Sequence, residues 1–303
     1  MLPETESDFT KARNKAFFNE LQHLLNPEET KMISFKQIKS LLKPQNQTYI
    51  GMKTIPISKI VGSEGRYKDF DNQFFPKSSF LKERWEHVDE AVIKDIVLPP
   101  IRVYELGGLY FVRDGNHRVS VAKSKGVEFI DADIISLQTE IKLSPVRTLQ
   151  GMIKQIISWE KKNFYFETNF GDITDFWCLD FSLPGQYDII YQHILTHKYF
   201  INQGISEEIP IEEAIISWYS LVYLPVVKTI EKYKITRYVK ATESDLYVWI
   251  ITFWDDLKHK LGDEVELDTI VKDISLEYKS KPFMRLRNAI GRLILKKRIS
   301  KVK

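Results

Sequence analysis

The stretch Leu109-Tyr-Phe-Val-Arg-Asp-Gly-Asn-His-Arg-Val-Ser-Val-Ala122 decides the fold of the part of the chain around it. Its side chains follow a strand period up to Asp114, and Val119 and Ala122 then follow at helical spacing. Gly115 stands at the junction, where its freedom in φ lets a strand turn directly into a helix. The sequence therefore predicts a short strand, a tight turn and a helix.

The first turn of this predicted helix carries an amide, an imidazole and a guanidinium, from Asn116, His117 and Arg118. Unpaired backbone N–H groups at a helix N-terminus favour an anion, and these three side chains can donate to phosphate oxygens. The pattern indicates a phosphate site. An ordinary strand-to-helix turn with a solvated first turn is the alternative, and the residues by themselves leave both open.

Further elements complete a small domain around this stretch. Thr54–Val61 alternates as an edge strand does, and Pro56 is tolerated in such a strand. A helix capped by a serine is expected within 78–92, and further strands are expected at 101–106 and 129–135. Together these elements predict a small mixed sheet.

The flanking segments are predicted to be mostly helical. Residues 1–50 carry two helical patterns and are expected to form a helical arm before the sheet domain at 51–141. Residues 142–280 carry several apolar stripes at helical spacing, with a short β-hairpin or a pair of extended segments expected at 164–181, where aromatic and β-branched residues gather. The predicted fold class is α+β, a small mixed-sheet domain followed by a mainly helical domain.

The helical half contains three more specific signals. Pro225 is expected to kink or split its helix, because it lacks an N–H and crowds the preceding turn. Thr242-Glu-Ser-Asp245 predicts a helix cap. His193 and His197 have a spacing that suits a metal, but paired surface or interface histidines are the favoured interpretation, and no metal site is predicted.

Composition limits the classes of protein that need to be considered. The 303 residues are 43% hydrophobic and 13% aromatic, which is ample for packed cores. Cys178 is the one cysteine, so an internal disulfide framework is excluded and a reducing compartment is favoured. The chain shows no basic leader and no apolar run of roughly 18 to 20 residues, so we expect a cytoplasmic protein without a transmembrane segment.

Positive charge is concentrated near the C-terminal end. Residues 279–303 contain ten Lys or Arg and no Asp or Glu, although the net charge of the whole chain is only +3. Residues 281–303 have the pattern of a basic amphipathic segment. A solvated helix end, a contact with nucleic acid and a contact with an acidic membrane are three interpretations that stay open.

Residues of about 53–137 resemble the ParB/sulfiredoxin-like nucleotide-binding domain. The likeness rests on the strand Ile55–Ile60, the arginine of the polar loop and the Gly-x-x-Arg box Gly115–Arg118. Members of this family bind CTP, ATP or ADP, so the resemblance implies one of these nucleotides, together with Mg²⁺. It also implies that the phosphates are held by Arg66, Asp114, Gly115, Asn116, His117 and Arg118.

The branches of this family differ at the same box. Sulfiredoxin-like enzymes have a nucleophilic cysteine where this chain has Asn116, so reduction of a sulfinic acid is not expected. Chromosome-partitioning ParB proteins continue with a helix-turn-helix, which residues 145–181 do not predict. ParB-fold free-serine kinases have an Asp-Gly-His-His-Arg box similar to Asp114–Arg118 and an acidic base in the upstream loop, about where Glu64 stands.

The resemblance therefore implies a nucleotide-binding protein that hydrolyses the nucleotide or phosphorylates a small hydroxyl compound. In such a reaction Glu64 would accept the proton of the substrate hydroxyl, and His117 and Arg118 would neutralise developing charge. Asn116 departs from the first histidine of the kinase box, so catalysis and binding alone both stay open. A non-enzymatic, DNA-associated regulator with a nucleotide switch is the alternative. Residues 145–275 resemble a helical bacterial domain of unknown function, which says nothing of activity.

Overall fold

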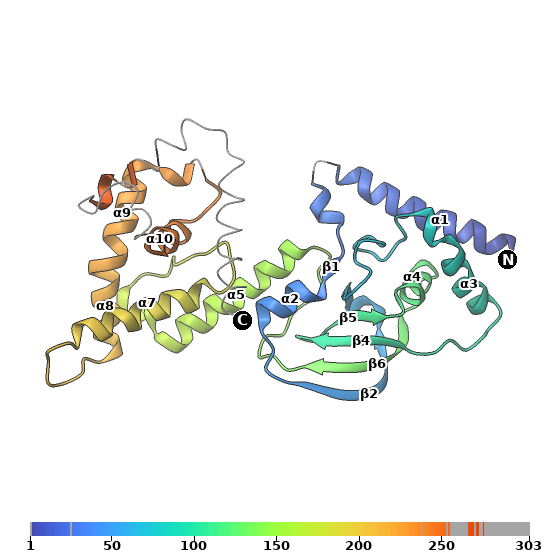
Figure 1. The fold of residues 1–303 in the computed structure, drawn as a ribbon, viewed down its shortest axis with the longest axis horizontal. Helices are drawn as coiled ribbons and strands as arrows, with labels where there is room; N and C mark the ends of the chain where they lie inside the picture. The colour runs from blue at the N-terminus through green and yellow to red at the C-terminus, as the bar shows by residue number, and fades with distance from the viewer. Residues whose placement is uncertain are drawn as a thin grey trace. The chain divides into compact units, whose positions relative to one another are not determined.

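A computed structural model gives the structure of the protein, described for residues 2–24, 26–237, 239–252, 254, 266–269, 271–272 and 275. The chain divides into two compact units, residues 1–156 and 157–303, and each is described by itself. The first unit contains a mixed sheet and the second is helical (Figure 1). The predicted α+β fold class is confirmed.

Six strands of the described chain form the sheet, in the order β1-β3-β5-β4-β6-β2. They are β1 (Ile33–Ser34), β2 (Gln47–Pro56), β3 (Ile60–Ser63), β4 (Ile101–Leu106), β5 (Leu109–Asp114) and β6 (Phe129–Leu137). Strand β3 is parallel to β1 and β5, and β4 is parallel to β6, whereas the pairs β4–β5 and β2–β6 are antiparallel. The carboxyl ends of β3 and β5 therefore meet at one edge of the sheet, where β4 begins.

The strand predicted at 54–61 is in fact two elements. Strand β2 lies at the edge of the sheet, as expected, but it ends at Pro56, and Ile57–Lys59 form a 3-10 turn before β3. Proline has no N–H to extend the ladder, and the N–H of Ile57 donates to the Glu128 carbonyl at 2.9 Å instead. Strand β3 then joins the sheet beside β5. Residues 1–50 contain β1 and the start of β2 as well as helices.

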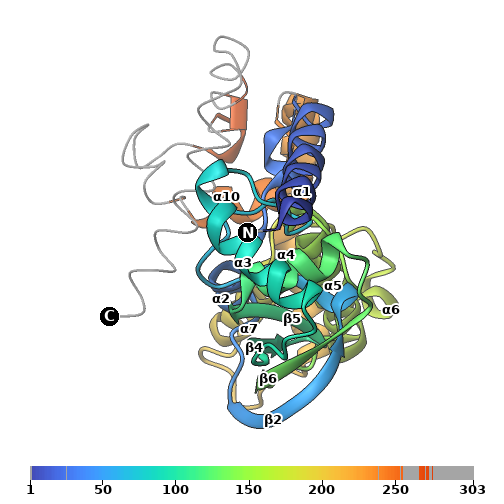
Figure 2. The ribbon, with the colours of Figure 1, turned by 90° about the vertical axis from the view of Figure 1, so that its right-hand side faces the viewer.

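Three helices lie in succession over one face of the sheet (Figure 2): α4 (Asn116–Ser124), α3 (Lys82–Ile93) and α1 (Pro3–Gln22). Trp85 of α3 donates its indole N–H to Ser120 Oγ of α4 over 2.9 Å, and both residues are fully buried. Lys125 follows α4 and pairs with Asp8 of α1 at 2.7 Å and with Asp89 of α3 at 3.2 Å. These contacts hold the three helices against one another.

The opposite face of the sheet is covered by α2 (Phe35–Leu42). The ring of Phe35 stacks on that of Tyr104, with centroids 4.3 Å apart. Tyr104 and its neighbour Val103 point to opposite sides of β4, and Val103 belongs to the core beneath α4. The sheet is therefore buried on both faces near the middle of β4.

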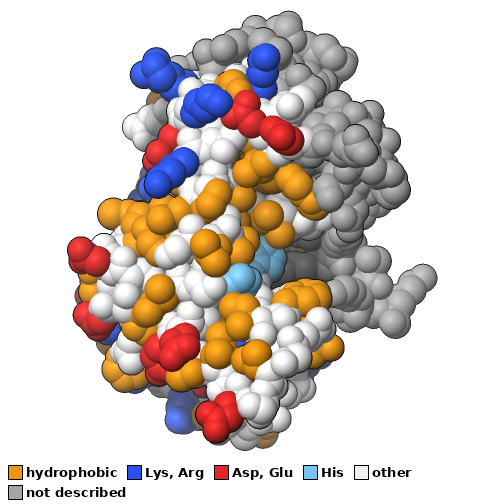
Figure 3. Space-filling model, turned by 90° about the vertical axis from the view of Figure 1, so that its left-hand side faces the viewer, with side chains coloured by type: hydrophobic (Ala, Val, Ile, Leu, Met, Phe, Trp, Pro, Cys, Tyr) orange, Lys and Arg blue, Asp and Glu red, His pale blue; other side chains and the backbone are white. Residues whose placement is uncertain are grey.

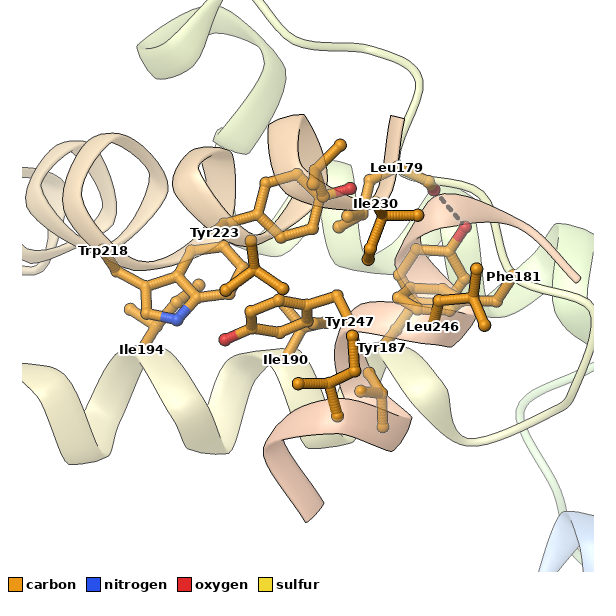
Figure 4. Close-up of a cluster of buried hydrophobic side chains, with 14 of the residues drawn as sticks. Leu179, Phe181, Tyr187, Ile190, Ile194, Trp218, Tyr223, Ile230, Leu246 and Tyr247 are labelled. Carbon is orange, nitrogen blue, oxygen red and sulfur yellow. Dashed lines mark hydrogen bonds between the residues drawn. The ribbon is translucent and has the colours of Figure 1, made fainter. Parts of the chain in front are cut away.

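The second unit contains most of the helices after the sheet. They are α5 (Leu149–Thr168), which begins in the first unit, α6 (Phe170–Thr174), α7 (Gln186–Ile201), α8 (Ile211–Trp218), α9 (Leu224–Tyr233) and α10 (Glu243–Thr252). Trp218, Tyr223 and Tyr247 form the centre of its core (Figure 4). The buried hydroxyl groups are satisfied, because Tyr187 donates to the Leu179 carbonyl at 2.7 Å and Tyr223 lies 2.8 Å from the Ser244 hydroxyl.

The β-hairpin predicted at 164–181 is wrong. Helix α5 continues to Thr168, Asn169 takes a left-handed conformation with φ of 49°, and α6 follows directly. Phe164 and Phe170 lie on helices and face the core, where their ring centroids are 5.5 Å apart. Phe166 on α5 is largely exposed, and Phe176 and Trp177 follow α6 in irregular chain. Packing of this helical stripe outweighs the intrinsic strand preference of aromatic residues.

Two local predictions in the helical unit are confirmed. A π-helical turn at Tyr219–Tyr223 separates α8 from α9 just before Pro225, which cannot donate a helical hydrogen bond. The N–H of Asp245 donates to Thr242 Oγ1 at 3.0 Å, and the N–H of Thr242 donates to Asp245 Oδ2 at 3.0 Å. These reciprocal bonds are those of a capping box.

Figure 3 shows one face of the protein, on which hydrophobic side chains gather beside histidines. His193 Nδ1 lies 3.4 Å from the Tyr247 hydroxyl, and His197 Nε2 lies 2.9 Å from Ser217 Oγ. Within the described ranges, no three His, Cys, Asp or Glu side chains are grouped as metal ligands would be.

No described helix combines the length and the apolar character that crossing a bilayer requires. The basic segment 281–303 lies outside the described residues.

Candidate functional site: an arginine-lined cavity at the start of α4

The candidate site lies where β3 and β5 end. Beyond the last residue of β3, the N–H of Glu64 donates to the Val112 carbonyl at 2.9 Å, so the chain stays beside β5. Asp114 ends β5 and lies opposite Arg102 of β4. Loops that follow neighbouring parallel strands meet at one edge of a sheet, which is a common place for a ligand.

Gly115 makes the direct passage from β5 to α4 possible. Its φ is +103°, a conformation that side-chain-bearing residues rarely adopt. A Cβ atom at this position would lie 2.6 Å from Ile101 Cγ2, so the backbone approaches β4 more closely than any other residue type allows. The junction predicted from the sequence therefore also depends on a close contact with β4.

A cavity of about 140 Å³ opens in front of this junction. Its walls come from the loop after β3, from α3, from the end of β5 and from the first turn of α4. The lining residues are Arg66, Arg84, Val88, Arg113, Asp114, Gly115, Asn116, His117 and Arg118. Arginine contributes more of these residues than any other type, so the cavity is strongly positive.

Asn116 and His117 are buried at the base of this site, with 6% and 7% of their surface exposed. Within the described part of the chain, Asn116 Oδ1 and His117 Nδ1 have no hydrogen-bond partner. A buried polar atom without a partner costs free energy that a ligand can recover. Because a rotated amide presents its NH₂ group at the same place, Asn116 can either accept from a ligand or donate to it.

His117 is neutral at physiological pH. Burial, as the largest cause, and the positive charges of Arg84 and Arg66 together lower its pKa to about 4, although Asp69 partly opposes them. Its ring packs edge-on against Phe70, with centroids 5.3 Å apart. A neutral imidazole still has one N–H to donate and one nitrogen to accept, and an anion in the cavity would favour its charged form.

Arg118 is held by the protein itself. Its Nη2 donates to Asp114 Oδ2 at 2.7 Å, and its Nη1 donates to the carbonyls of Pro99 and, at 2.8 Å, Pro100. Its side chain is only 15% exposed. Arg118 therefore connects the start of α4 to the start of β4, and its remaining N–H groups are what it offers the cavity.

The other arginines are more available. Arg66 donates to Asp69 at 2.8 Å, but half of its side chain is exposed. Arg113 lies over the ring of Tyr104 at 5.8 Å, and Arg84 is exposed, with no ion pair among the described residues. The side chains of Arg66 and Arg84 can turn toward an anion without breaking buried contacts, whereas the guanidinium of Arg113 lies on the α2 side of the sheet.

The structure brings together most of the residues that the sequence suggested. Arg66 and the box Asp114–Arg118 line one cavity, whereas Glu64 follows β3 nearby but does not line it. Sequence reasoning missed Arg84 and Arg113. Arg113 directly precedes Asp114, so its position beside the predicted box is visible in the sequence. Arg84 had no such signal, because nothing local shows that α3 packs beside the start of α4.

Comparisons with known proteins add little to this geometry. No family model matches the chain, and no curated protein matches it. Among solved structures it is similar to that of a Pnob8-like ParB-N domain, with 12% sequence identity over 81% of this chain and 99% of the other, and a TM-score of 0.22. A TM-score this low does not establish a shared fold, so the α+β fold rests on the sheet and helices described above.

Proposed function

We propose that the cavity at the start of α4 binds the phosphate groups of a nucleotide, ATP, ADP or CTP. The observation that carries this proposal is that Arg66, Arg84 and Arg118 line one cavity at the first turn of a helix. Guanidinium groups bind phosphate through paired hydrogen bonds, and the free N–H groups of a helix N-terminus add to the attraction. The unpartnered atoms of Asn116 and His117 offer further contacts to a bound group.

The size of the cavity indicates which part of the nucleotide it can enclose. A volume of about 140 Å³ is well below the roughly 300–1,000 Å³ of pockets that enclose a whole small molecule. Phosphate groups fit inside it, and the sugar and base would extend beyond its rim. Affinity is therefore expected to depend on the phosphates more than on the base, which agrees with the family resemblance of residues 53–137.

Asp114 is the residue suited to hold Mg²⁺ beside the phosphates. Its side chain is 56% exposed and lines the cavity, and only its Oδ2 is engaged by Arg118. Mg²⁺ in nucleotide sites is commonly held by one or two carboxylates and the phosphate oxygens. When bound, the ion would supply neutralisation of phosphate charge, while the arginines orient the phosphate groups.

We further propose that the protein transfers a phosphate group from the bound nucleotide. Glu64 follows β3 one residue after Ser63, two residues before Arg66, and is partly exposed. A carboxylate at that place can accept a proton from a substrate hydroxyl or a water that approaches the phosphate from the loop side. His117, neutral and buried, would donate a hydrogen bond to the phosphate. The acceptor would then be a small hydroxyl compound, or water in a hydrolase.

Calorimetric titration of the full chain tests the binding. Wild-type protein should bind ATP, ADP or CTP, and also pyrophosphate, whereas adenosine should bind far more weakly. Arg84→Gln should lower the affinity about tenfold or more, because a hydrogen bond to a charged group is worth about 1.5–3 kcal/mol. Arg13→Gln, on the exposed side of α1, is the matched control and should bind as wild type does.

Two results would overturn this proposal. One is the absence of saturable binding of any of these phosphates by the wild-type protein, with and without Mg²⁺. The other is an Arg84→Gln variant whose affinity equals that of Arg13→Gln, because the cavity would then not hold the phosphates.

A non-enzymatic regulator that contacts DNA is the second candidate. Its support is the concentration of ten Lys or Arg in residues 279–303, a segment outside the described residues. Such a protein should bind duplex DNA with an affinity that falls steeply as salt rises, and deletion of 281–303 should abolish the binding. Binding that is absent, or that does not respond to salt, would remove this candidate.

A further inference from the structure

A second cavity, of about 370 Å³, lies toward the other end of α4. Its walls come from residues 57–61, from the loop at 72–75, from Lys123 near the end of α4, and from residues 145–147. All of these belong to the first unit. No residue lines both this cavity and the arginine-lined one, so the two are separate sites.

Two positive side chains face this second cavity. Lys123 Nζ donates to the Ile60 carbonyl at 3.3 Å and lies 4.5 Å from the ring centroid of Phe74. Its ammonium therefore keeps two N–H groups for other partners. Arg147 is exposed and has no ion pair among the described residues. Both cations are thus available to one ligand.

Asp71 acts electrostatically on Lys123, but both oxygens of its carboxylate are hydrogen-bonded elsewhere. It is completely buried, and it accepts hydrogen bonds from the Asn19 amide at 2.9 Å and from the N–H groups of Gln73 and Phe75 at 2.9 and 2.8 Å. Burial, as the largest cause, lowers the pKa of Lys123 to about 8, with Asp71 opposing the shift and Arg147 contributing to it. The cavity therefore holds positive charge that no carboxylate of the described chain neutralises by direct contact.

The rest of the cavity wall is largely apolar. Ile57, Val61 and Phe75 are buried, with 4%, 6% and 8% of their surface exposed, and Pro145 and Val146 close the side that carries Arg147. A ligand that filled the cavity would remove apolar surface from water as well as meet two cations. An inorganic anion would use only the second of these features.

We infer that this cavity binds a small organic anion, with its carboxylate or phosphate between Lys123 and Arg147 and its apolar body against Ile57, Val61 and Phe75. This site is additional to the proposed nucleotide site and does not depend on it. Its volume lies within the range of pockets that enclose a whole small molecule, about 300–1,000 Å³. Because two cations line the cavity, the charge of the ligand should decide its affinity.

Calorimetry on the full chain with three matched probes tests this inference. Phenylacetate and phenyl phosphate carry the two candidate head groups on an aromatic body, and phenylacetamide has nearly the shape of phenylacetate without its charge. At least one anion should bind at a single site, about tenfold or more tightly than the amide. Arg147→Gln and Lys123→Met should each remove this preference, whereas Lys142→Gln, which changes an exposed lysine of the same segment, should preserve it.

The controls separate this site from the proposed nucleotide site. Arg84→Gln should leave the binding of phenylacetate unchanged, because Arg84 lines only the other cavity. Arg147 is exposed, so Arg147→Gln is expected to fold even if Lys123→Met does not. Equal affinities for amide and anions, the lack of saturable binding, or an unchanged Arg147→Gln variant would each overturn the inference.

Discussion

The guanidinium of Arg118 donates from Nη2 to the carboxylate of Asp114 over 2.7 Å, and from Nη1 to the carbonyls of Pro99 and Pro100. Arg118, the last residue of the Gly-x-x-Arg box, therefore has two roles. It connects the start of α4 to the start of β4, and it lines the cavity. Loss of function in an Arg118 variant would by itself not distinguish these two roles. A variant of Arg84, which is exposed and lines the cavity, tests ligand binding without the structural role.

Arg118→Gln is expected to destabilise the fold. The fold would lose three charge-assisted hydrogen bonds of a guanidinium that is only 15% exposed, at a cost of about 1–3 kcal/mol. Arg84→Gln is the matched variant and should change the free energy of unfolding by less than about 0.5 kcal/mol, as exposed substitutions do. Urea unfolding followed by circular dichroism measures the free energy of unfolding of both variants. Equal stabilities would contradict the structural role of Arg118.

Gly115→Ala should be more harmful than the same change at the other end of the helix. Ala would combine an unfavourable positive φ with a Cβ atom 2.6 Å from Ile101 Cγ2, at a total cost of about 2–4 kcal/mol. Gly126 also has a positive φ, but a Cβ there meets nothing within 4 Å, so Gly126→Ala should cost only about 1–2 kcal/mol. Thermal unfolding of the two variants measures the difference. Equal costs would show that the contact with β4 is not tight.

His117 should titrate far below an ordinary histidine, near the pKa of about 4 that its burial and the nearby arginines produce. Between the unfolded value of about 6.5 and this folded value, the unfolded chain binds the extra proton, so the folded state loses stability as pH falls. Melting temperatures at about pH 7.5 and about pH 5 should therefore differ more for wild type than for His117→Gln. The same response in both proteins would show that His117 is not responsible.

A phosphate in the cavity should raise the pKa of His117, because an anion favours the imidazolium form. Histidine ring resonances followed by NMR across the pH range, with and without pyrophosphate, measure this shift. The His117→Gln spectrum identifies the resonance. A downward shift, or none at saturating pyrophosphate, would mean that the anion binds elsewhere.

Glu64→Gln should leave the affinity for ADP unchanged, because Glu64 does not line the cavity. If the protein transfers or releases phosphate, the same variant should lose turnover, since an amide cannot accept the proton of a hydroxyl group. Phosphate release and calorimetry on one preparation give both quantities. Glu83→Gln, an exposed change on α3, is the control. Full turnover in Glu64→Gln would exclude this carboxylate as the base.

Local patterns predicted most of the sheet domain well. The boundaries of β4 are those expected, and the strand, turn and helix at 109–124 follow the expected order, because glycine placement and side-chain period act over a few residues. The hairpin expected at 164–181 failed for the opposite reason. Aromatic residues suit strands and buried helix faces alike, and only the packing of Phe164 and Phe170 in the core decided between them.

The sequence by itself determined the junction Asp114-Gly115-Asn116, since a strand that ends at a glycine and continues as a polar helix start is specified by neighbouring residues. Only the tertiary structure decided that Arg84 stands beside that junction, because Trp85 of α3 bonds to Ser120 of α4. The same holds for Lys123 and Arg147, which share a cavity although the chain between them forms a strand and a loop. Contacts between distant segments depend on how whole elements pack, and short-range periodicity does not encode that packing.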